Sequence, residues 1–354
     1  MAARRVFLGI DVGASNTRAI LGEERDGKFA PVLDGEECEV RGRYRTADFK
    51  SVPQIARRFL NDNARALKRC RIAGAAVGIA AFVENGNAPK GPAMPFGMKI
   101  SQVSDLLECP AYGMGDIPPQ VWGMNLLPRS DFVLVSLPRT KVGRIPQQTM
   151  ICFGTGIGAV PVTYLDGVQR PDRPTEFGQM EWATRTLQEW KYRNFLIKAK
   201  ISTDGPVPNE EACNLWNIAQ WLLSKVTKRE SAAIRQRLAV AQDKAATVYS
   251  LAQESGAGTD ICREAVELYI RMMGRLAGQY TLAQGGFGGC YIGGGIGLKY
   301  GAWRLVQDGF MEEFYAVGHY ESKMRRTPVY LVNREVGDLG AAYAAFNLVR
   351  QRAA

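Results

Sequence analysis

Apolar and polar positions follow the same order in two separate stretches of the chain. An apolar run at 6–10 leads into a turn rich in Gly, Ser, Asn and Thr, and a second apolar run follows at 19–21. The order recurs where an apolar run at 150–153 leads through a glycine-rich turn to another at 159–164. Each stretch predicts a strand, a tight turn and a second strand. Because such turns expose backbone N–H groups and short hydroxyls that can bind a phosphate, the two together predict a nucleotide held by duplicated halves.

The rest of the pattern predicts further strands and a block of helices. Strand-like runs occupy 72–83, 289–292 and 329–332, and helical patterns occupy 53–70, 182–200, 210–226, 231–253 and 259–284. The residues at 259–260 supply a predicted N-cap for the last helix, and two glycines at 285–286 end it. A glycine cluster at 293–297 precedes another predicted helix, and a loop with two glycines at 337–340 precedes a terminal helix.

This order of elements predicts an α/β protein of two lobes with a cleft between them. We expect a small lobe formed by residues 1–117 together with 336–354. We expect a large lobe formed by residues 118–335, which carries the helical block as an insert. A chain of 354 residues is long enough for two domains of ordinary size.

Composition narrows the class of protein. Hydrophobic residues make up 46% of the chain and charged residues 23%, which is typical of a globular protein. The longest apolar run, 72–83, is too short to cross a bilayer, and no signal peptide is expected after Arg4 and Arg5. The seven cysteines contain no Cys-x-x-Cys pair, which favours reduced thiols over disulfides or a zinc site. We therefore expect a cytoplasmic protein without a membrane partner.

The net charge of +10 raises the question of a nucleic-acid partner. The basic residues are scattered, however, with small clusters at 41–45 and 57–58 and no basic motif interleaved with aromatic residues. This distribution favours a solvated basic surface over nucleic-acid binding. The surplus of positive charge also favours an anionic ligand such as ATP.

Three glycine motifs compete as nucleotide signals. Gly154-x-Gly156-x-x-Ala159 has the spelling of a dinucleotide-binding fingerprint, but that motif must open a helix and 160–164 has the pattern of a strand. Residues 22–28 nearly spell a phosphate-binding P-loop, but no Ser or Thr follows the lysine to hold magnesium. The cluster at 293–297 fits neither register and instead suits close approach of the backbone to a base or sugar.

Two aspartates are candidates for chemistry, each with a structural alternative. Asp11 ends the first strand and either hydrogen-bonds the turn backbone or reaches Mg²⁺ through water. Asp116 precedes a Pro-Pro pair and is either a turn residue or a catalytic carboxylate. The only histidine, His319, is expected on the surface, so a carboxylate is the natural general base. The segment 176–179 is either an ordinary helix entry or a polar edge presented to a polyol.

Four motifs in order resemble the bacterial glucokinase family, within the hexokinase and actin-like ATPase superfamily, whose fold is ribonuclease-H-like. The first and second phosphate loops are similar to 11–18 and 154–158, the adenosine segment to 288–296, and the closing loop to 337–341. The resemblance implies ATP and Mg²⁺ as cofactors. It implies nucleotide-binding roles for Asp11, Gly13, Ala14, Ser15, Asn16, Thr17, Gly154, Thr155, Gly156, Gly293, Gly294 and Gly295, with Asp11 also near the metal.

The resemblance also assigns the acceptor side. Asp116 falls on the family's catalytic aspartate, which takes the proton of the sugar 6-hydroxyl, and Glu176 aligns with a glutamate that binds ring hydroxyls. The implied substrate-binding residues are Gly115, Asp116, Glu176, Gly178 and Gln179.

The acceptor side departs from the family pattern at several positions. Gly115 stands where the family has Asn, and Gln179 where it has His. A further sugar-binding glutamate of the family would fall near Lys200, in an alignment that crosses an uncertain gap. An asparagine expected near Pro95 is absent, and so is the zinc-binding motif of the related repressor/open-reading-frame/kinase family. A polar site that has lost hydrogen-bonding partners discriminates against its former ligand. The expectation is therefore phosphorylation of a polyhydroxy acceptor whose identity the sequence leaves open.

The leading hypothesis is ATP-dependent phosphorylation of a primary hydroxyl of a hexose or sugar-like polyol, with Asp116 as general base. One alternative is a non-catalytic sugar or nucleotide sensor that retains the kinase fold. Another is a filament-forming actin-like ATPase. The expected partner is a small-molecule acceptor, and the oligomeric state stays open, with a homodimer among the possibilities.

Overall fold

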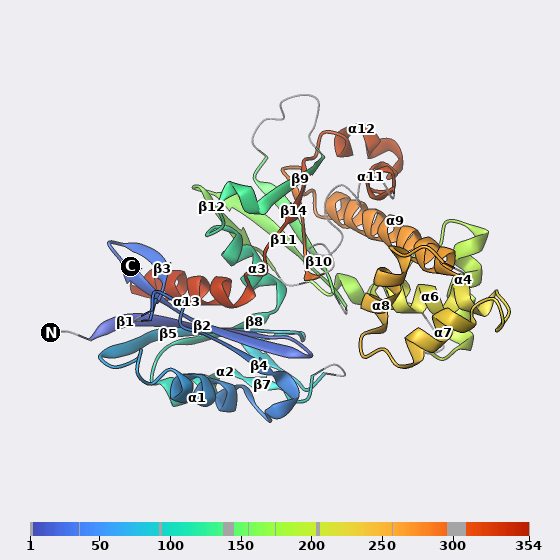
Figure 1. Cartoon of the computed structure of the whole chain (residues 1–354). Helices are drawn as coiled ribbons and strands as arrows, with labels where there is room; N and C mark the ends of the chain where they lie inside the picture. Colours follow the sequence, from blue (N-terminus) through green and yellow to red (C-terminus); the bar gives the residue numbers. More distant parts are fainter. Residues whose placement is uncertain are drawn as a thin grey trace. The chain divides into compact units, whose positions relative to one another are not determined.

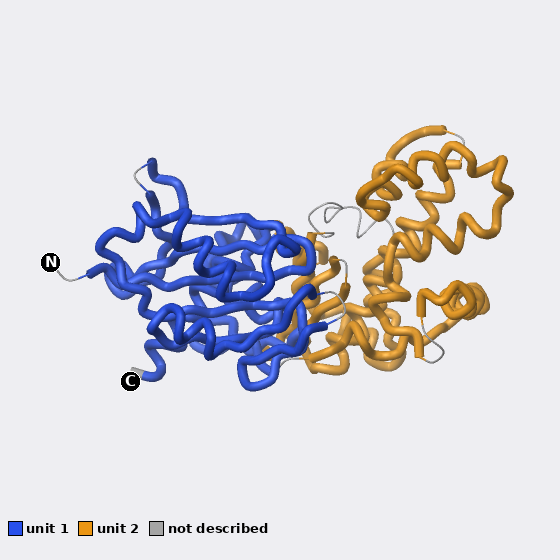
Figure 2. Tube along the Cα trace, turned by 90° about the horizontal axis from the view of Figure 1, so that it is seen from below, with its two compact units in different colours: residues 1–132, 160–174, 334–354 blue, residues 133–159, 175–333 orange. Residues whose placement is uncertain are grey.

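A computed structural model shows how the chain folds (Figure 1). It describes residues 3–34, 36–91, 94–136, 145–154, 156–173, 175–202, 206–256, 258–295 and 309–353. The chain forms two compact units, coloured separately in Figure 2. Unit 1 comprises Met1–Phe132, Val160–Pro174 and Arg334–Ala354, and unit 2 comprises Val133–Ala159 and Thr175–Asn333. The division into domains predicted at residues 117 and 336 stays a prediction about folding units.

Unit 1 is built on a mixed sheet with strand order β3-β2-β1-β5-β8, and β4 pairs with β2. Its strands are β1 (Arg4–Val12), β2 (Asn16–Arg25), β3 (Lys28–Pro31), β4 (Arg41–Arg45), β5 (Cys70–Ile79) and β8 (Ala111–Gly115). Strands β1, β5 and β8 are parallel, whereas β2 is antiparallel to β1, β3 and β4. A short antiparallel pair, β6 (Asn87–Ala88) and β7 (Met98–Lys99), lies apart from this sheet.

Helices cover both faces of the sheet in unit 1 (Figure 1). One face carries α1 (Val52–Asp62) and α2 (Ile100–Leu107), and the other carries α3 (Ile117–Met124) and α13 (Gly337–Ala353). Alternate residues of β1 serve the two layers: Leu8 and Ile10 join the core with α1, whereas Phe7 packs edge-on against Phe346 of α13. Because side chains alternate along a strand, Asp11 points to the same face as Phe7.

A second sheet has the order β12-β11-β10-β13-β14-β9. Its strands are β9 (Phe132–Ser136), β10 (Gln147–Phe153), β11 (Ile157–Leu165), β12 (Val168–Pro171), β13 (Cys290–Gly293) and β14 (Val329–Val332). Strand β13 is parallel to both β10 and β14. The two sheets thus contain the predicted strand–turn–strand units, β1–β2 and β10–β11.

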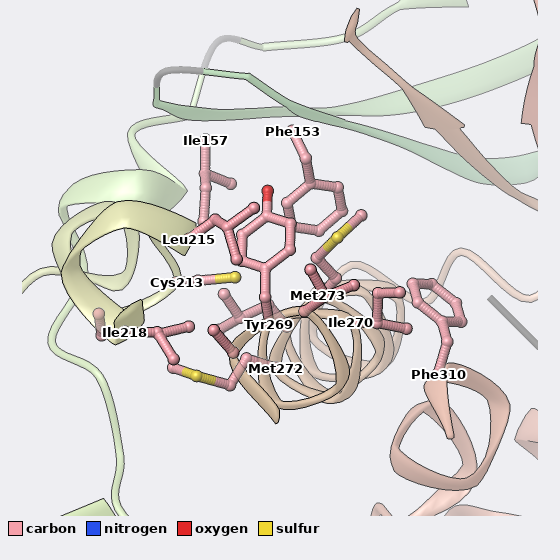
Figure 3. Close-up of a cluster of buried hydrophobic side chains, with 14 of the residues drawn as sticks. Phe153, Ile157, Cys213, Leu215, Ile218, Tyr269, Ile270, Met272, Met273 and Phe310 are labelled. Atoms are coloured by element: carbon pink, nitrogen blue, oxygen red, sulfur yellow. The ribbon is translucent and has the colours of Figure 1, made fainter. Parts of the chain in front are cut away.

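The helices of unit 2 pack around α9 (Thr259–Ala283). They are α4 (Leu187–Lys198), α5 (Asn209–Ala212), α6 (Leu215–Ser224), α7 (Ala232–Ala239), α8 (Lys244–Ala252), α11 (Phe310–Tyr315) and α12 (Glu321–Met324). Figure 3 shows Phe153 and Ile157, which flank the turn between β10 and β11, among side chains of α9 and α6. The second predicted phosphate loop is therefore anchored at both ends in the core of unit 2.

Several sequence predictions need correction. The helix predicted at 53–70 ends at Asp62, because the chain turns before Cys70 to begin β5. The predicted helices 210–226 and 231–253 are each interrupted, and 182–200 begins only at Leu187. Helix α2 was not expected. The residue that caps α9 is Gly258 rather than the predicted Thr259, and the helix predicted after the glycine cluster falls mostly outside the described residues.

The predicted loop with Gly337 and Gly340 is wrong, because both glycines belong to α13. A Cβ at Gly340 would lie 1.8 Å from the backbone oxygen of Pro119 in α3. The glycine is therefore needed for close packing of two helices, not for a bend.

All seven cysteines are free thiols, and five of them are buried. Across the part of the chain that the structure describes, we find no helix with the length and apolarity needed to cross a bilayer.

Candidate functional site

The first predicted phosphate loop is the turn between β1 and β2. The Gly13 N–H donates to the Asn16 carbonyl at 3.0 Å and closes the turn. Ser15 and Asn16 are exposed and Gly13 and Ala14 are half-buried, so the loop can meet a ligand from solvent. Thr17 differs, because its side chain is fully buried.

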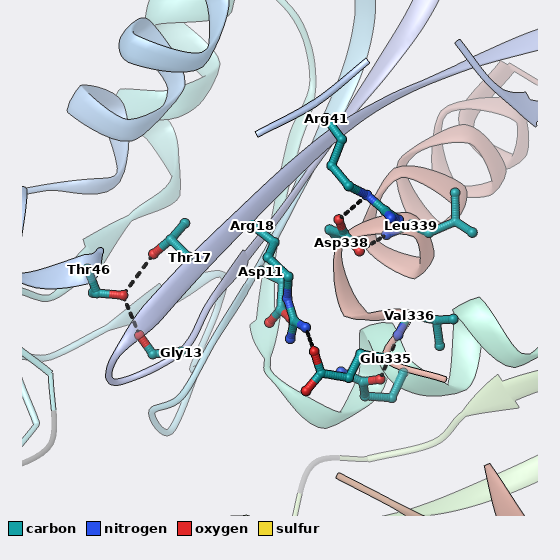
Figure 4. Close-up of polar contacts among 11 residues, drawn as sticks. Asp11, Gly13, Thr17, Arg18, Arg41, Thr46, Glu335, Val336, Asp338 and Leu339 are labelled. Carbon is teal, nitrogen blue, oxygen red and sulfur yellow. Dashed lines mark hydrogen bonds and ion pairs between the residues drawn. The ribbon is translucent and has the colours of Figure 1, made fainter. Parts of the chain in front are cut away.

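Asp11 of β1 lies at the base of this loop, where its side chain is buried against the start of α13 (Figure 4). Its Oδ2 accepts a hydrogen bond from Nη2 of Arg18 at 2.9 Å, and Arg18 also pairs with Glu335. Burial raises the pKa of Asp11 from 3.8 to about 6, Arg18 opposes that shift, and the nearby Asp338 carboxylate adds to it. The raised pKa means that ionised Asp11 lowers the stability of the folded state at neutral pH.

A second ion pair lies beside the first (Figure 4). Asp338 of α13 pairs with Nε of Arg41 on β4 at 2.9 Å. The start of α13 comes so near that a Cβ at Gly337 would lie 2.3 Å from Oδ2 of Asp11. Only glycine leaves room for the Asp11 carboxylate at this position.

The Asp11 carboxylate can be tested against the expected magnesium ion. Mg²⁺ usually takes one or two carboxylates and completes its shell with water and phosphate oxygens. Within the described residues, no group of three His, Cys, Asp or Glu side chains is arranged to hold a metal ion. Since Arg18 already occupies one oxygen of Asp11, the residues fit contact with a nucleotide-bound Mg²⁺ through water rather than a metal site of the protein alone.

Asp116 and the first loop lie at the same edge of the sheet in unit 1. Val12 of β1 is in register with Ile79 of β5, and Ile79 with Gly115 of β8. These three strands are parallel, so their carboxyl ends meet at one edge, where open α/β sheets bind ligands. Asp116 follows directly as the half-buried N-cap residue of α3. Two strand spacings place its backbone about 10 Å from that of β1.

The glycines of unit 2 also gather at one sheet edge. Gly154 donates to the carbonyl of Gly156 at 3.0 Å in the turn after β10. Cys152 of β10 is in register with Gly293 of the parallel β13, so Gly293, Gly294 and Gly295 follow at the same edge. Gly294 has a φ of +91°, and a Cβ there would lie 2.3 Å from the Phe153 carbonyl. Thr155, predicted to bind phosphate, lies outside the described residues.

The predicted acceptor residues form a polar group beside this second loop. Glu176 and Gln179 are exposed, and Gly178 between them is buried in a short 3-10 helix (Phe177–Gln179). The Gln179 amide donates to Oε1 of Glu210 at 2.7 Å. Although the Glu176 residue is exposed, its carboxyl is partly desolvated, which raises its pKa, and the Glu210 carboxylate raises that pKa further. The structure thus brings together two carboxylates and one amide.

Glu210 is a candidate site residue that the sequence pattern did not reveal. A Cβ added at Gly156 would lie 2.9 Å from Oε2 of Glu210, and one added at Gly178 would lie 3.3 Å from it. Glu210 therefore contacts both the second loop and the Glu176–Gln179 segment. The Asn209 side chain fixes it there by donating to the Phe177 carbonyl at 3.0 Å. The resemblance aligns a further glutamate of the family near Lys200, across an uncertain gap, and so does not point to Glu210. The acidic first turn of α5 was the available signal.

Solved structures share this arrangement of elements. The chain superposes on a glucokinase from an Antarctic psychrotroph with a TM-score of 0.71 and 19% identity, covering 97% of this chain and 99% of that one. It superposes on glucokinase from Balamuthia mandrillaris in complex with glucose with a TM-score of 0.75 and 16% identity, covering 97% and 94%. For a glucokinase of the repressor/open-reading-frame/kinase family from Streptomyces griseus, in complex with glucose and AMPPNP, the TM-score is 0.60 at 16% identity, covering 98% and 99%. The fold is therefore the α/β fold of the actin-like ATPases.

The sequence comparison is more specific. The glucokinase family model matches residues 8–348, so the chain belongs to the glucokinase family. A bifunctional glk protein of Burkholderia orbicola is 35% identical over 104 residues, which are 28% of this chain and 16% of that protein. A glucokinase of Aromatoleum aromaticum is 39% identical over 87 residues, 24% and 26% of the two chains. The chain thus aligns with less than a third of each relative's length.

Proposed function

We propose that this protein transfers the γ-phosphoryl group of ATP to a primary hydroxyl of a hexose or sugar-like polyol. The observation that carries the proposal is the position of Asp116. It lies at the carboxyl edge of the parallel strands β1, β5 and β8, and the first loop follows β1 at the same edge. Membership of the glucokinase family supports the same reaction. So do the glucose and AMPPNP held by related folds.

The proposed chemistry assigns a role to each group. Gly13 to Thr17 and Gly154 to Gly156 bind the phosphates through their backbones, and Gly293, Gly294 and Gly295 lie against the adenosine. Asp116 takes the proton of the acceptor hydroxyl as its oxygen bonds to the γ-phosphorus and the bond to the β-phosphate oxygen breaks, releasing ADP. Asp11 would hold a nucleotide-bound Mg²⁺ through water, and that ion would supply positive charge to neutralise the phosphates.

The polar group formed by Glu176, Gln179 and Glu210 is proposed to bind the ring hydroxyls of the sugar. Glu176 and Glu210 offer carboxylate acceptors, and Gln179 offers an amide. Gly178 lets this segment pack against the Ile157 carbonyl, since a Cβ there would lie 2.3 Å from that oxygen. Gly115 in unit 1 leaves room next to Asp116. Gln179 occupies one oxygen of Glu210 and cannot carry a positive charge, as a histidine at that position can. Acceptor preference is therefore proposed to differ from that of relatives with histidine. We propose the cytoplasm as the site of action, since ATP and reduced thiols occur there.

A screen of ATP consumption over hexoses, amino sugars and cyclitols tests the proposal, with Asp116→Asn as the control protein. We expect at least one acceptor to give a phosphorylated product with wild type and almost none with the variant.

The altered acceptor residues favour a second candidate, a non-catalytic sugar or nucleotide sensor. Binding of ATP or sugar without phosphorylation of any acceptor would support the sensor and contradict the kinase.

A further inference from the structure

The backbone at the end of β4, at Arg45 and Thr46, contacts the backbone of the first phosphate loop. Neither Arg45 nor Thr46 belongs to a glycine motif. Arg45 is in register with Asn16, and the Thr46 N–H donates to the Ser15 carbonyl at 3.1 Å. Figure 4 shows Thr46 beside Gly13 and Thr17. The loop is therefore held by β4 as well as by its own hairpin.

The Thr46 hydroxyl forms a directed chain of hydrogen bonds. It donates its single hydrogen to the Gly13 carbonyl at 2.7 Å, so the Thr17 hydroxyl, 3.0 Å away, must donate to Thr46. Both threonine side chains are fully buried, and water cannot replace these bonds. Losing the Thr46 hydroxyl would leave the Thr17 hydroxyl without its acceptor in a dry site.

These bonds orient an N–H group of the loop. Thr46 fixes the carbonyls of Gly13 and Ser15 toward β4. In a planar trans peptide the following N–H points opposite to the carbonyl, so the N–H group of Ala14 points away from Thr46 and out of the hairpin. Backbone N–H groups aimed outward from a turn are what a phosphate binds.

Arg45 adds a positive charge next to the first loop, on the sheet face that carries Asp11. Residues paired directly across antiparallel strands project from the same face, so Arg45 shares a face with Asn16, and Arg43 shares it with Arg18. This is the face that carries Asp11. Arg45 is exposed, and the described residues place no acidic side chain within ion-pair distance of it. A guanidinium matches the geometry of phosphate oxygens.

We propose that Arg45 and Thr46 complete the phosphate site of unit 1. Thr46 is a positioning residue that aims the Ala14 N–H group, and Arg45 contacts the phosphates of the bound nucleotide. The inference rests on the proposed function for the identity of the ligand, ATP.

The test is the affinity for ATP, measured by calorimetry without acceptor, for the full chain and four variants. Thr46→Val removes the hydroxyl at nearly constant volume, Thr46→Ser retains it, and Arg45→Gln removes the charge. Arg57→Gln is the matched control, an exposed arginine on α1. We expect Thr46→Val and Arg45→Gln each to weaken binding about tenfold, the effect of one charged or buried hydrogen bond. Thr46→Ser and Arg57→Gln should stay within about threefold of wild type.

Two further readouts separate positioning from folding. The KM for the acceptor should be unchanged in all four variants, and ATP binding by Arg45→Gln should depend less on salt than wild type. If Thr46→Val does not fold, Arg45→Gln and Thr46→Ser still decide the matter. Wild-type affinity in both Thr46→Val and Arg45→Gln overturns the inference. ATP binding without transfer in wild type overturns the proposed function alone, and absence of ATP binding in wild type overturns both.

Discussion

Asp11 is a candidate site residue whose ionised form is disfavoured by its surroundings in the folded protein. Its carboxylate is buried, one arginine pairs with it, and a second carboxylate lies nearby. Burial and the Asp338 charge outweigh the attraction of Arg18, since the pKa of Asp11 rises to about 6. Such perturbed groups gather at functional sites, because chemistry there takes precedence over stability.

Replacing Asp11 by Asn should therefore stabilise the protein at neutral pH. The native pKa lies above the ordinary 3.8, so native Asp11 holds a proton between about pH 4 and 6 that the unfolded chain has lost, and stability falls as the pH rises through that window. Thermal unfolding should show a gain of up to about 3 kcal/mol for Asp11→Asn at pH 7.5 that disappears near pH 4. Arg18 keeps Glu335 as a partner in the variant.

The control for that comparison is Glu181→Gln, which removes one acid from an exposed pair with Arg193. Its stability should change by less than about 1 kcal/mol at either pH. A lower melting temperature for Asp11→Asn than for wild type at pH 7.5 would contradict the account.

At the same scale, the sequence could reveal some site residues and not others. Asp11 ends a strand-like run just before a glycine-rich turn, and Asp116 precedes a Pro-Pro pair, so the pattern could single out both as candidates. The resemblance to the glucokinase family then favoured a catalytic role for Asp116. Glu210 and Thr46 could not be found that way, because each acts through contacts with residues about 30 or more positions away along the chain. Such contacts exist only in the folded chain, and the local spacing carries no trace of them.

At the scale of elements, helix length decided which predictions held. Helix α9 was predicted almost to its ends, since 25 residues give a sustained apolar period and glycine ends it. The shorter helices were merged, because apolar residues continue across their breaks. Asn214 and Asp243 cap α6 and α8 within those merged stretches, and both are recognisable N-cap residues.

Close helix packing yields a prediction for α9. A Cβ at Gly274 would lie 2.1 Å from the backbone oxygen of Phe310 in α11, and backbone cannot swing aside as a side chain can. Gly274→Ala should therefore destabilise unit 2 by about 1–3 kcal/mol, despite the better helix propensity of alanine. Urea unfolding measures the loss. Gly91→Ala, where a Cβ would meet nothing within 4 Å, is the control and should be nearly neutral.

Equal stability of Gly274→Ala and wild type would show that α11 adjusts to α9. The packing argument would then fail at this contact, together with the same reading of Gly278, whose Cβ would lie 2.4 Å from the Phe314 oxygen.

At the scale of the whole molecule, the candidate groups are divided between the two units. Unit 1 carries Asp11, the first loop and Asp116, whereas unit 2 carries the second loop, the glycines after β13 and the Glu176–Gln179 group. The glucokinase family model spans both. The proposed activity therefore requires both units.

Hydrogen exchange tests that division of labour. We expect a non-hydrolysable ATP analogue to slow amide exchange both at 13–17 and around Gly154 and Gly156, because the phosphates are assigned to both loops. Peptides from α7 and α8 serve as an internal reference and should not change. Protection confined to one loop would contradict the assignment of phosphate binding to both units.

The central claim is that Asp116 is the general base of phosphoryl transfer, and turnover of Asp116→Asn with the best acceptor tests it most directly. The account predicts that the variant binds ATP as wild type does but loses at least about 100-fold in kcat, since general-base catalysis contributes 10²- to 10⁴-fold. Near-normal turnover by Asp116→Asn would contradict it.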